Sequence, residues 1–352
     1  MRKRFVFFYA CFCLILTSIF VYYANLLDKA KDTKLKEEET KEKITNITKY
    51  IEDNNIKDVI KVKITSTGEI KEMTVYDYLL GVLPSEMPPE YEMEALKAQA
   101  VVARTYLYNK IGTNAHTDAD ICDNPSHCQA FYTKEQILKI WERSKKWDET
   151  ERENHWKKVE AAVQSTENIA VTYKDKYIKA YFHACSGGKT ENVSNIWGRQ
   201  NISYLVSVES PGEENYKNYT STVKLSISNL QEKLNEDNTI KCSIDTEGGD
   251  IVEILSYTDT GRVDKVKIGG IIYKAETLRT ALGLRSTNFT VEYDGEEVIF
   301  NVTGNGHGVG MSQVGANYYA TQGYTFDKII THYYTGVDVT YINKEETNEN
   351  KI

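Results

Sequence analysis

The segment 304–316, GNGHGVGMSQVGA, combines residue types and spacing that suit a binding site. Four of its glycines lie within seven residues and surround one histidine, His307. Glycine at this density lets the backbone adopt left-handed conformations and approach another group closely. The residues that follow predict a helix, so a polar loop opens onto a helix N-terminus. His307 could donate to a substrate oxygen or orient an acid, and the alternative is a purely structural glycine turn.

Glu86 is a candidate general acid. It lies in LPSEMPP, where three of the chain's five prolines fall within six residues and predict a rigid turn before a helix at 90–110. A helix N-terminus would lower the pKa of Glu86, whereas burial would raise it. A general acid at neutral pH requires that burial dominate. The alternative is an exposed glutamate that interacts only with the helix dipole.

Two further segments carry cysteine and histidine. In HACSGGKTE, His183 and Cys185 suggest a nucleophile pair, but residues two apart on a strand point the same way without necessarily touching. A tight turn is the alternative there. A second group spans 13 residues and suits a tetrahedral, structural Zn²⁺ site, with a Cys122–Cys128 disulfide as the alternative. Its four members are His116, Cys122, His127 and Cys128.

The elements that must position these residues indicate an α+β fold, because helices and strands interleave irregularly. We predict mixed helices and antiparallel strands in a single body, residues 58–342, with a substrate cleft where 304–316 meets 84–88. The predicted helices are 74–80, 90–110, 134–145, 156–165, 275–282 and 326–334, with another after residue 310. The predicted strands are 59–64, 70–73, 169–173, 177–183, 204–208, 251–257, 263–268, 289–293 and 297–302.

The N-terminus predicts a membrane anchor. Residues 5–27 carry no charge and follow a basic start at 1–4, which is long enough to span a bilayer with the N-terminus in the cytoplasm. A cleaved signal peptide is the alternative, and either way the body is exported. Residues 28–57 read as a charged stalk and 343–352 as a polar tail. The net charge of −8 argues against nucleic acid as a partner.

Three segments, 75–106, 183–198 and 304–316, together resemble the stage II sporulation protein D family, which shares a domain with amidase-enhancer proteins. The resemblance implies a single-pass cell-membrane protein whose outer domain is a peptidoglycan lytic transglycosylase acting during forespore engulfment. Its substrate would be glycan strands stripped of stem peptides. Its partners would be the sporulation amidase and the membrane scaffold of the engulfment machinery.

The resemblance also assigns roles to residues. Glu86 falls on the family's catalytic glutamate, and the Cys/His cluster resembles a zinc site thought to occur in some clostridial members. One glutamate is enough because the sugar's own C6 hydroxyl attacks, so no second carboxylate must activate water, unlike in ordinary glycoside hydrolysis. Val206 and Val314 depart from the family pattern in the groove. The residues expected to bind substrate are Arg104, Thr190, Glu191, Tyr204, His307 and Gln313.

Overall fold

The computed structural model describes residues 59–111, 116–198, 201–236, 242–244 and 251–342, which belong to one compact unit, Val59–Ile352. No helix within these residues is long and apolar enough to cross a membrane. The predicted membrane span at 5–27, the stalk at 28–57 and the tail at 343–352 lie outside the described residues.

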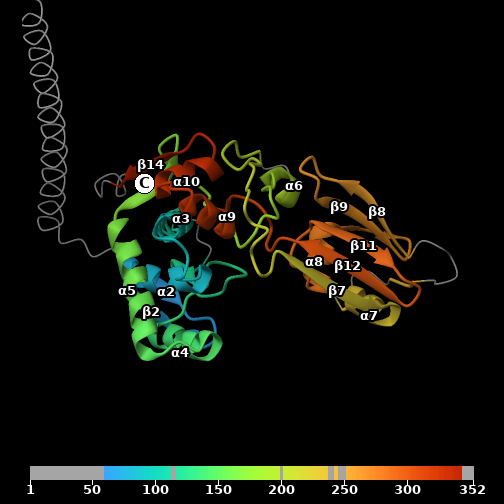
Figure 1. Ribbon diagram of the computed structural model, residues 1–352, viewed down its shortest axis with the longest axis horizontal. Coiled ribbons are helices and arrows are strands. Elements are labelled where there is room, and N and C mark those ends of the chain that lie inside the picture. The colour runs from blue at the N-terminus through green and yellow to red at the C-terminus, as the bar shows by residue number, and fades with distance from the viewer. Residues whose placement is uncertain (1–58, 112–115, 199–200, 237–241, 245–250, 343–352) are drawn as a thin grey trace, which may run out of the picture. The chain divides into compact units, whose positions relative to one another are not determined.

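Helices and strands alternate along the unit, as expected for an α+β fold (Figure 1). The first part contains β1 (Val59–Lys63), β2 (Ile70–Thr74), α2 (Val75–Glu86), α3 (Met93–Lys110), β3 (Ile121–Cys122), α4 (Lys134–Lys145), α5 (Glu149–Ser165), β4 (Ile169–Tyr173), β5 (Lys176–Tyr177), β6 (Phe182–His183) and α6 (Val193–Trp197). The middle contains β7 (Thr220–Ser226), α7 (Ile227–Asn235), β8 (Val252–Tyr257), β9 (Val263–Ile268), β10 (Ile271–Lys274), α8 (Ala275–Leu282), β11 (Phe289–Tyr293) and β12 (Glu297–Thr303). The chain then forms β13 (Met311–Ser312), α9 (Gln313–Thr321), α10 (Phe326–Tyr333) and β14 (Asp338–Tyr341).

Helix α3 is the centre of the first hydrophobic core. It packs against α2, α5, α9, α10 and β4, so residues on most of its circumference are buried. A helix that is covered on nearly every side has no polar stripe. Its alanines at 95, 98, 100 and 103 are fully buried, and their small size lets these neighbours approach closely. Because α9 and α10 follow the glycine-rich loop, this core joins the two ends of the described chain.

A second hydrophobic core lies within residues 220–303, which we call the strand-rich region. Two antiparallel sheets, in the orders β10-β9-β8 and β11-β12-β7, contribute to it together with α7 and α8. Gly261 and Gly295 form the turns between β8 and β9 and between β11 and β12, with φ of 91° and 101°, and Gly283 ends α8 in the left-handed conformation. Buried residues of the first core resume at Val309. In sequence, the strand-rich region is therefore an insertion between two parts of the first core. The glycine-rich loop leads the chain back to the first core.

The rigid turn predicted around Glu86 begins later than expected, at Met87. Helix α2 continues through Pro84 and ends at Glu86, and the backbone turns away only at Met87, whose N–H donates to the Leu83 carbonyl at 2.9 Å. The Ser85 hydroxyl donates to the carbonyl of Gly81, within the turn where Pro84 removes a backbone donor. Glu86 therefore lies at the C-terminal end of a helix rather than at the N-terminus of the next.

Two other elements differ from the predictions. The region 177–183 is not one strand, because β5 forms a short hairpin with β4 and β6 pairs in parallel with β13. Residues 204–208 form no regular strand. Helix α5 begins at Glu149, seven residues before the predicted start, because Asp148 and Glu151 form a capping box. The β6–β13 pairing matters for the site, because it places the segments 183–198 and 304–316 side by side.

Candidate functional site

Glu86 is a half-buried carboxylate with one backbone partner, the Ala130 N–H, which donates to its Oε1 at 2.9 Å. Burial raises the pKa of Glu86 above its ordinary value, and the Ala130 hydrogen bond opposes this only in part. The C-terminal end of α2 disfavours a negative charge, which acts in the same direction as burial. Two tyrosines lie close enough to Glu86 for its charge to contribute to their raised pKa, Tyr78 and Tyr106. This environment favours the protonated acid.

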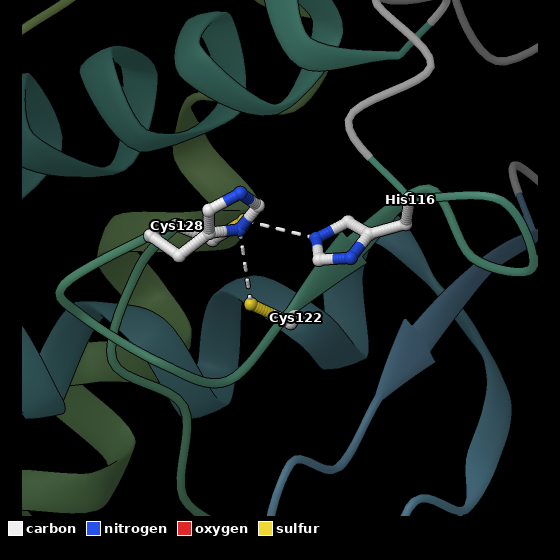
Figure 2. A group of neighbouring side chains, drawn as sticks. His116, Cys122 and Cys128 are labelled. Atoms are coloured by element: carbon white, nitrogen blue, oxygen red, sulfur yellow. Dashed lines mark hydrogen bonds between the residues drawn. The ribbon is translucent and has the colours of Figure 1, made fainter.

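The four predicted metal ligands lie together in one loop system (Figure 2). Their ligand atoms are all within 4.8 Å of one another, and neither Cys122 nor Cys128 forms a disulfide. The Sγ of Cys128 is 3.4 Å from Nε2 of His116 and 3.3 Å from Nδ1 of His127, while the Sγ of Cys122 is 3.6 Å from that Nδ1. Zn–S and Zn–N bonds of roughly 2.3 and 2.0 Å imply ligand separations of about 3.3–3.8 Å around a tetrahedral ion. The residues therefore fit a closed zinc site.

The loop that carries this cluster also reaches the acid. Strand β3, which contains Cys122, pairs in parallel with β1, and the N–H groups of His127 and Cys128 both donate to the Asn124 carbonyl. Two residues beyond Cys128, the Ala130 N–H binds Glu86. A structural ion here would fix the backbone that orients the Glu86 carboxyl.

The glycine-rich loop packs closely against the backbone of the segment that leads into β6. Gly304, Gly306, Gly308 and Gly310 all have φ between 75° and 112°. A Cβ on Gly310 would lie 2.0 Å from the Tyr181 carbonyl oxygen, so that position requires glycine. The loop then enters α9 through the N-cap Ser312, as predicted. In this structure the glycines seat the loop against the segment that leads into β6.

His307 is held by the backbone at both ring nitrogens. The Val309 N–H donates to its Nδ1 at 3.0 Å, and a second hydrogen bond joins the ring to the Phe182 backbone. Burial and the nearby arginines lower the pKa of His307 to about 3, so the ring is neutral. Among the described residues, no hydrogen bond or ring contact joins His307 to Glu86. Tyr181, a ring neighbour of His307, and Glu86 both contribute to the raised pKa of Tyr106.

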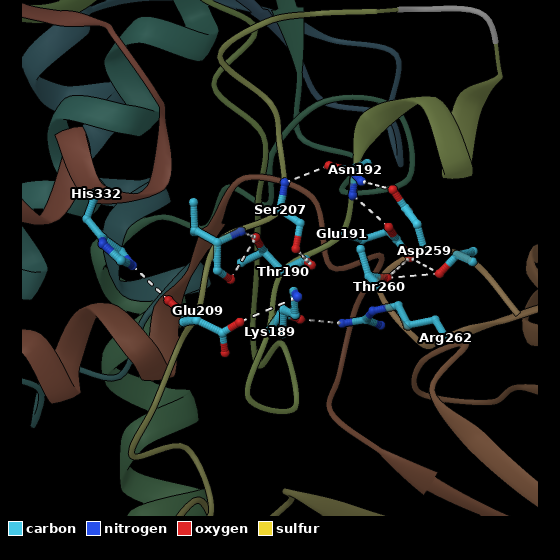
Figure 3. Close-up of polar contacts among 12 residues, drawn as sticks. Lys189, Thr190, Glu191, Asn192, Ser207, Glu209, Asp259, Thr260, Arg262 and His332 are labelled. Atoms are coloured by element: carbon cyan, nitrogen blue, oxygen red, sulfur yellow. Dashed lines mark hydrogen bonds and ion pairs between the residues drawn. The ribbon is translucent and has the colours of Figure 1, made fainter.

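Thr190 and Glu191 are buried and bonded within the protein. The Thr190 hydroxyl accepts from the Val208 N–H, and Glu191 accepts from the hydroxyls of Thr258 and Thr260 at 2.9 and 2.6 Å (Figure 3). Glu191 thus fastens the first core to the strand-rich region.

The other predicted groove residues are also engaged inside the protein. Arg104 is buried and donates to the carbonyls of Thr166 and Ile169 at the start of β4. The Tyr204 hydroxyl accepts from the Lys179 N–H, and Gln313 donates to Gln99. Contacts of all these side chains with a substrate stay predictions.

Glu213 is the residue that the sequence analysis missed. It is fully buried and accepts from the N–H groups of Gly187 and Gly188 at 2.7 and 3.1 Å. Its remaining donors are the side chains of Cys185, Ser186, Ser210 and Ser312. It therefore ties the Ser-Gly-Gly turn to the N-cap of α9. Nothing in the local pattern PGEEN marks this glutamate, because most of its donors come from two distant segments, 185–188 and Ser312.

Cys185 donates to Glu213 rather than pairing with His183. Burial and the neighbouring Glu213 raise the pKa of the Cys185 thiol to about 12, which keeps it protonated. The buried His183 donates from Nδ1 to the Val309 carbonyl. The suggested Cys–His nucleophile pair is therefore not formed, and the segment is the tight turn that was its alternative. Cys242 is a buried free thiol in the second core.

Comparison with known proteins agrees with this architecture. Residues 63–173, which contain α2, the Cys/His loop and α3, match the sequence model "SpoIID: Stage II sporulation protein". Stage II sporulation protein D of Bacillus amyloliquefaciens is 35% identical over 280 residues, covering 78% of this chain and 77% of that protein. That of Bacillus subtilis (strain 168) is 32% identical over 293 residues, covering 81% of each. The chain belongs to the stage II sporulation protein D family. It is also related to a Bacillus subtilis amidase enhancer, 26% identical over 309 residues, with 40% of that protein covered.

Proposed function

We propose that this protein is a peptidoglycan lytic transglycosylase that cleaves peptide-free glycan strands to 1,6-anhydromuramyl products during forespore engulfment, with Glu86 as the only acid and base. The observation that carries the proposal is the raised pKa of Glu86 at the C-terminal end of α2. A general acid must hold its proton until the substrate takes it, and burial shifts the pKa of Glu86 in that direction.

One carboxyl group can perform both proton transfers. The Glu86 carboxyl gives its proton to the glycosidic oxygen as the bond to the anomeric carbon breaks. The resulting carboxylate then takes the proton of the C6 hydroxyl as that oxygen bonds to the anomeric carbon, which closes the anhydro ring and restores the acid. Because the nucleophile belongs to the sugar, the two-carboxylate arrangement of ordinary glycosidases is not needed.

The Ala130 N–H keeps Glu86 in place through this cycle. A hydrogen bond from a backbone N–H fixes the orientation of the carboxyl, and it strengthens when the group becomes a carboxylate. His116, Cys122, His127 and Cys128 would hold Zn²⁺, which would supply a rigid closure of the loop that leads to Ala130.

Digestion of peptide-free glycan by the full chain tests the proposal. The wild type is expected to release anhydromuramyl products, and Glu86→Gln, which keeps the hydrogen bond from Ala130 but has no proton to give, is expected to release none above background. Glu90→Gln is a matched control, since Glu90 is an exposed glutamate four residues away. Products from Glu86→Gln at the wild-type rate, or none from the wild type, would contradict the proposal.

The relation to the amidase enhancer favours a second candidate, a non-catalytic module that activates a cell-wall amidase. In that case the wild type and Glu86→Gln would stimulate a sporulation amidase equally, and neither would cut glycan alone.

We also propose that the chain is anchored in the cell membrane by residues 5–27, with its folded unit outside the cytoplasm near the engulfment scaffold. The uncharged length of that segment and its basic start support this placement. Protease treatment of intact cells, which should degrade the folded unit and spare a cytoplasmic control protein, tests it.

A further inference from the structure

Trp197 is the most exposed of the four tryptophans. The other three tryptophans are buried or half-buried, whereas 43% of Trp197 is exposed. Large aromatic side chains are usually covered in folded proteins, and an exposed one with aromatic neighbours commonly belongs to a binding surface.

Trp197 is part of a group of rings. Its ring centroid lies 4.7 Å from that of Tyr181 and 5.1 Å from that of His307. Tyr181 and His307 are themselves 6.3 Å apart, so the three rings contact one another pairwise. We call Tyr181, Trp197 and His307 the aromatic platform. It joins α6, the chain entering β6 and the glycine-rich loop, which are distant in sequence.

Hydrogen bonds within the protein fix the segments that carry the rings of the platform. The Tyr181 carbonyl accepts from the Tyr334 hydroxyl and the Met311 N–H at 2.6 and 3.1 Å. His307 is fixed by its two backbone hydrogen bonds. A surface fixed before binding loses little side-chain entropy when a ligand arrives.

Trp197 is held through Glu191. The Glu191 carboxylate accepts from the Asn192 N–H and from the Asn195 side chain, both at 2.7 Å; Asn192 is the N-cap of the short helix that ends in Trp197, and Asn195 lies within it. Glu191 is also bonded to Thr258 and Thr260 of the strand-rich region. A buried carboxylate thereby sets the position of the exposed ring, which explains why a charged residue is retained inside.

The chemistry of the platform suits a sugar ring. An aromatic face carries partial negative charge and attracts the polarised C–H groups on the flat face of a pyranose. His307 is neutral, so the platform has no fixed charge that would select an ionic ligand. Tyr181 and Glu86 both contribute to the raised pKa of Tyr106, so both lie near that residue.

We propose that Tyr181, Trp197 and His307 form a stacking subsite for one N-acetylhexosamine ring of the glycan strand whose cleaved bond lies at Glu86. The inference rests on the proposed function and assigns the subsite its ligand, a neutral β-linked pyranose presented by its apolar face. Trp197 is a binding residue in this scheme, and Glu191 positions it.

Binding measured without cleavage tests the subsite. The full chain carrying Glu86→Gln is titrated with peptide-free glycan strands and, as a soluble probe, with a β-1,4-linked N-acetylglucosamine hexamer. Acrylamide quenching of tryptophan fluorescence, which reports mainly on the exposed Trp197, is expected to fall on binding. Trp197→Ala should weaken binding by about fivefold, which corresponds to roughly 1 kcal/mol of ring stacking. Trp197→Phe should recover most of it.

Tyr257→Ala is the matched control, because Tyr257 is 60% exposed on β8 in the strand-rich region and should not affect binding. Binding by Trp197→Ala within twofold of its parent, or equal losses in Trp197→Ala and Tyr257→Ala, overturns the proposal. If Trp197→Ala weakens glycan binding but the wild type releases no anhydro products, the catalytic proposal fails and the subsite stands. If the wild type cleaves glycan and Trp197→Ala does so with unchanged KM, the subsite fails and the catalytic proposal stands.

Discussion

Glu213 offers a direct test of how the Ser-Gly-Gly turn at 186–188 is held against the N-cap of α9, which follows the glycine-rich loop. The perturbation is Glu213→Gln, which keeps the shape of the side chain and removes its charge and one acceptor atom. In the wild type, Oε2 accepts from the backbone N–H groups of Gly187 and Gly188, which cannot rotate. The amide oxygen of glutamine must therefore occupy the Oε2 position.

The glutamine NH₂ group then faces the hydroxyls that bind Oε1, those of Ser186, Ser210 and Ser312. The NH₂ group has two hydrogens, so at most two of these hydroxyls can reorient to accept, and the third loses this partner. Each remaining bond changes from charge-assisted to neutral, a loss of roughly 0.5–1 kcal/mol per bond. Part of this is offset because a buried charge is no longer desolvated. The expected net loss is about 2 kcal/mol, a fall in Tm of roughly 3 °C for a folded unit of this size.

Thermal unfolding of the full chain measures this, with Glu209→Gln as the control. Glu209 lies four residues earlier, its side chain is 74% exposed, and its loss should change stability by less than about 0.5 kcal/mol. Hydrogen exchange at Gly187 and Gly188 should accelerate in Glu213→Gln before the rest of the protein responds. Equal Tm values for the two variants would refute the role given to Glu213.

Two further predictions concern the acid and the metal. Because the folded-state pKa of Glu86 is raised above its ordinary value of 4.5, the folded protein binds more protons than the unfolded chain in this range, and its stability falls as pH rises through it. Glu86→Gln should therefore have a higher Tm than the wild type at pH 7 and lose that advantage below about pH 4.5; an unchanged difference across this range would contradict the burial argument. The reduced full chain should contain one zinc per chain by elemental analysis, and chelation or Cys122→Ser should lower its Tm by several degrees, whereas Cys242→Ser should retain the metal. Zinc well below one per chain would leave the cluster as a set of packed thiols and imidazoles.

Much of the fold could be predicted from local patterns. The strands at Val263–Ile268 and Phe289–Tyr293 and the helix at Ala275–Leu282 have the predicted bounds, because alternation, turn glycines and a C-cap are properties of short segments. The helix containing Pro84 was mispredicted because proline is a strong local signal for a break, and only the packing of α2 against α3 and α5 overrides it.

The sequence by itself determined the family, the four residues of the candidate metal site and the identity of the candidate acid. All three depend on residue types at fixed spacing, which the chain carries before it folds. The tertiary structure decided the environment of each carboxylate. Glu86 lies at the C-terminal end of a helix, and Glu191 is buried and bonded to the strand-rich region. Glu213 accepts hydrogen bonds from three segments. Trp197 joins Tyr181 and His307 only because β6 pairs with β13. Burial and hydrogen bonds between distant segments set charge, orientation and exposure, and no local pattern encodes them.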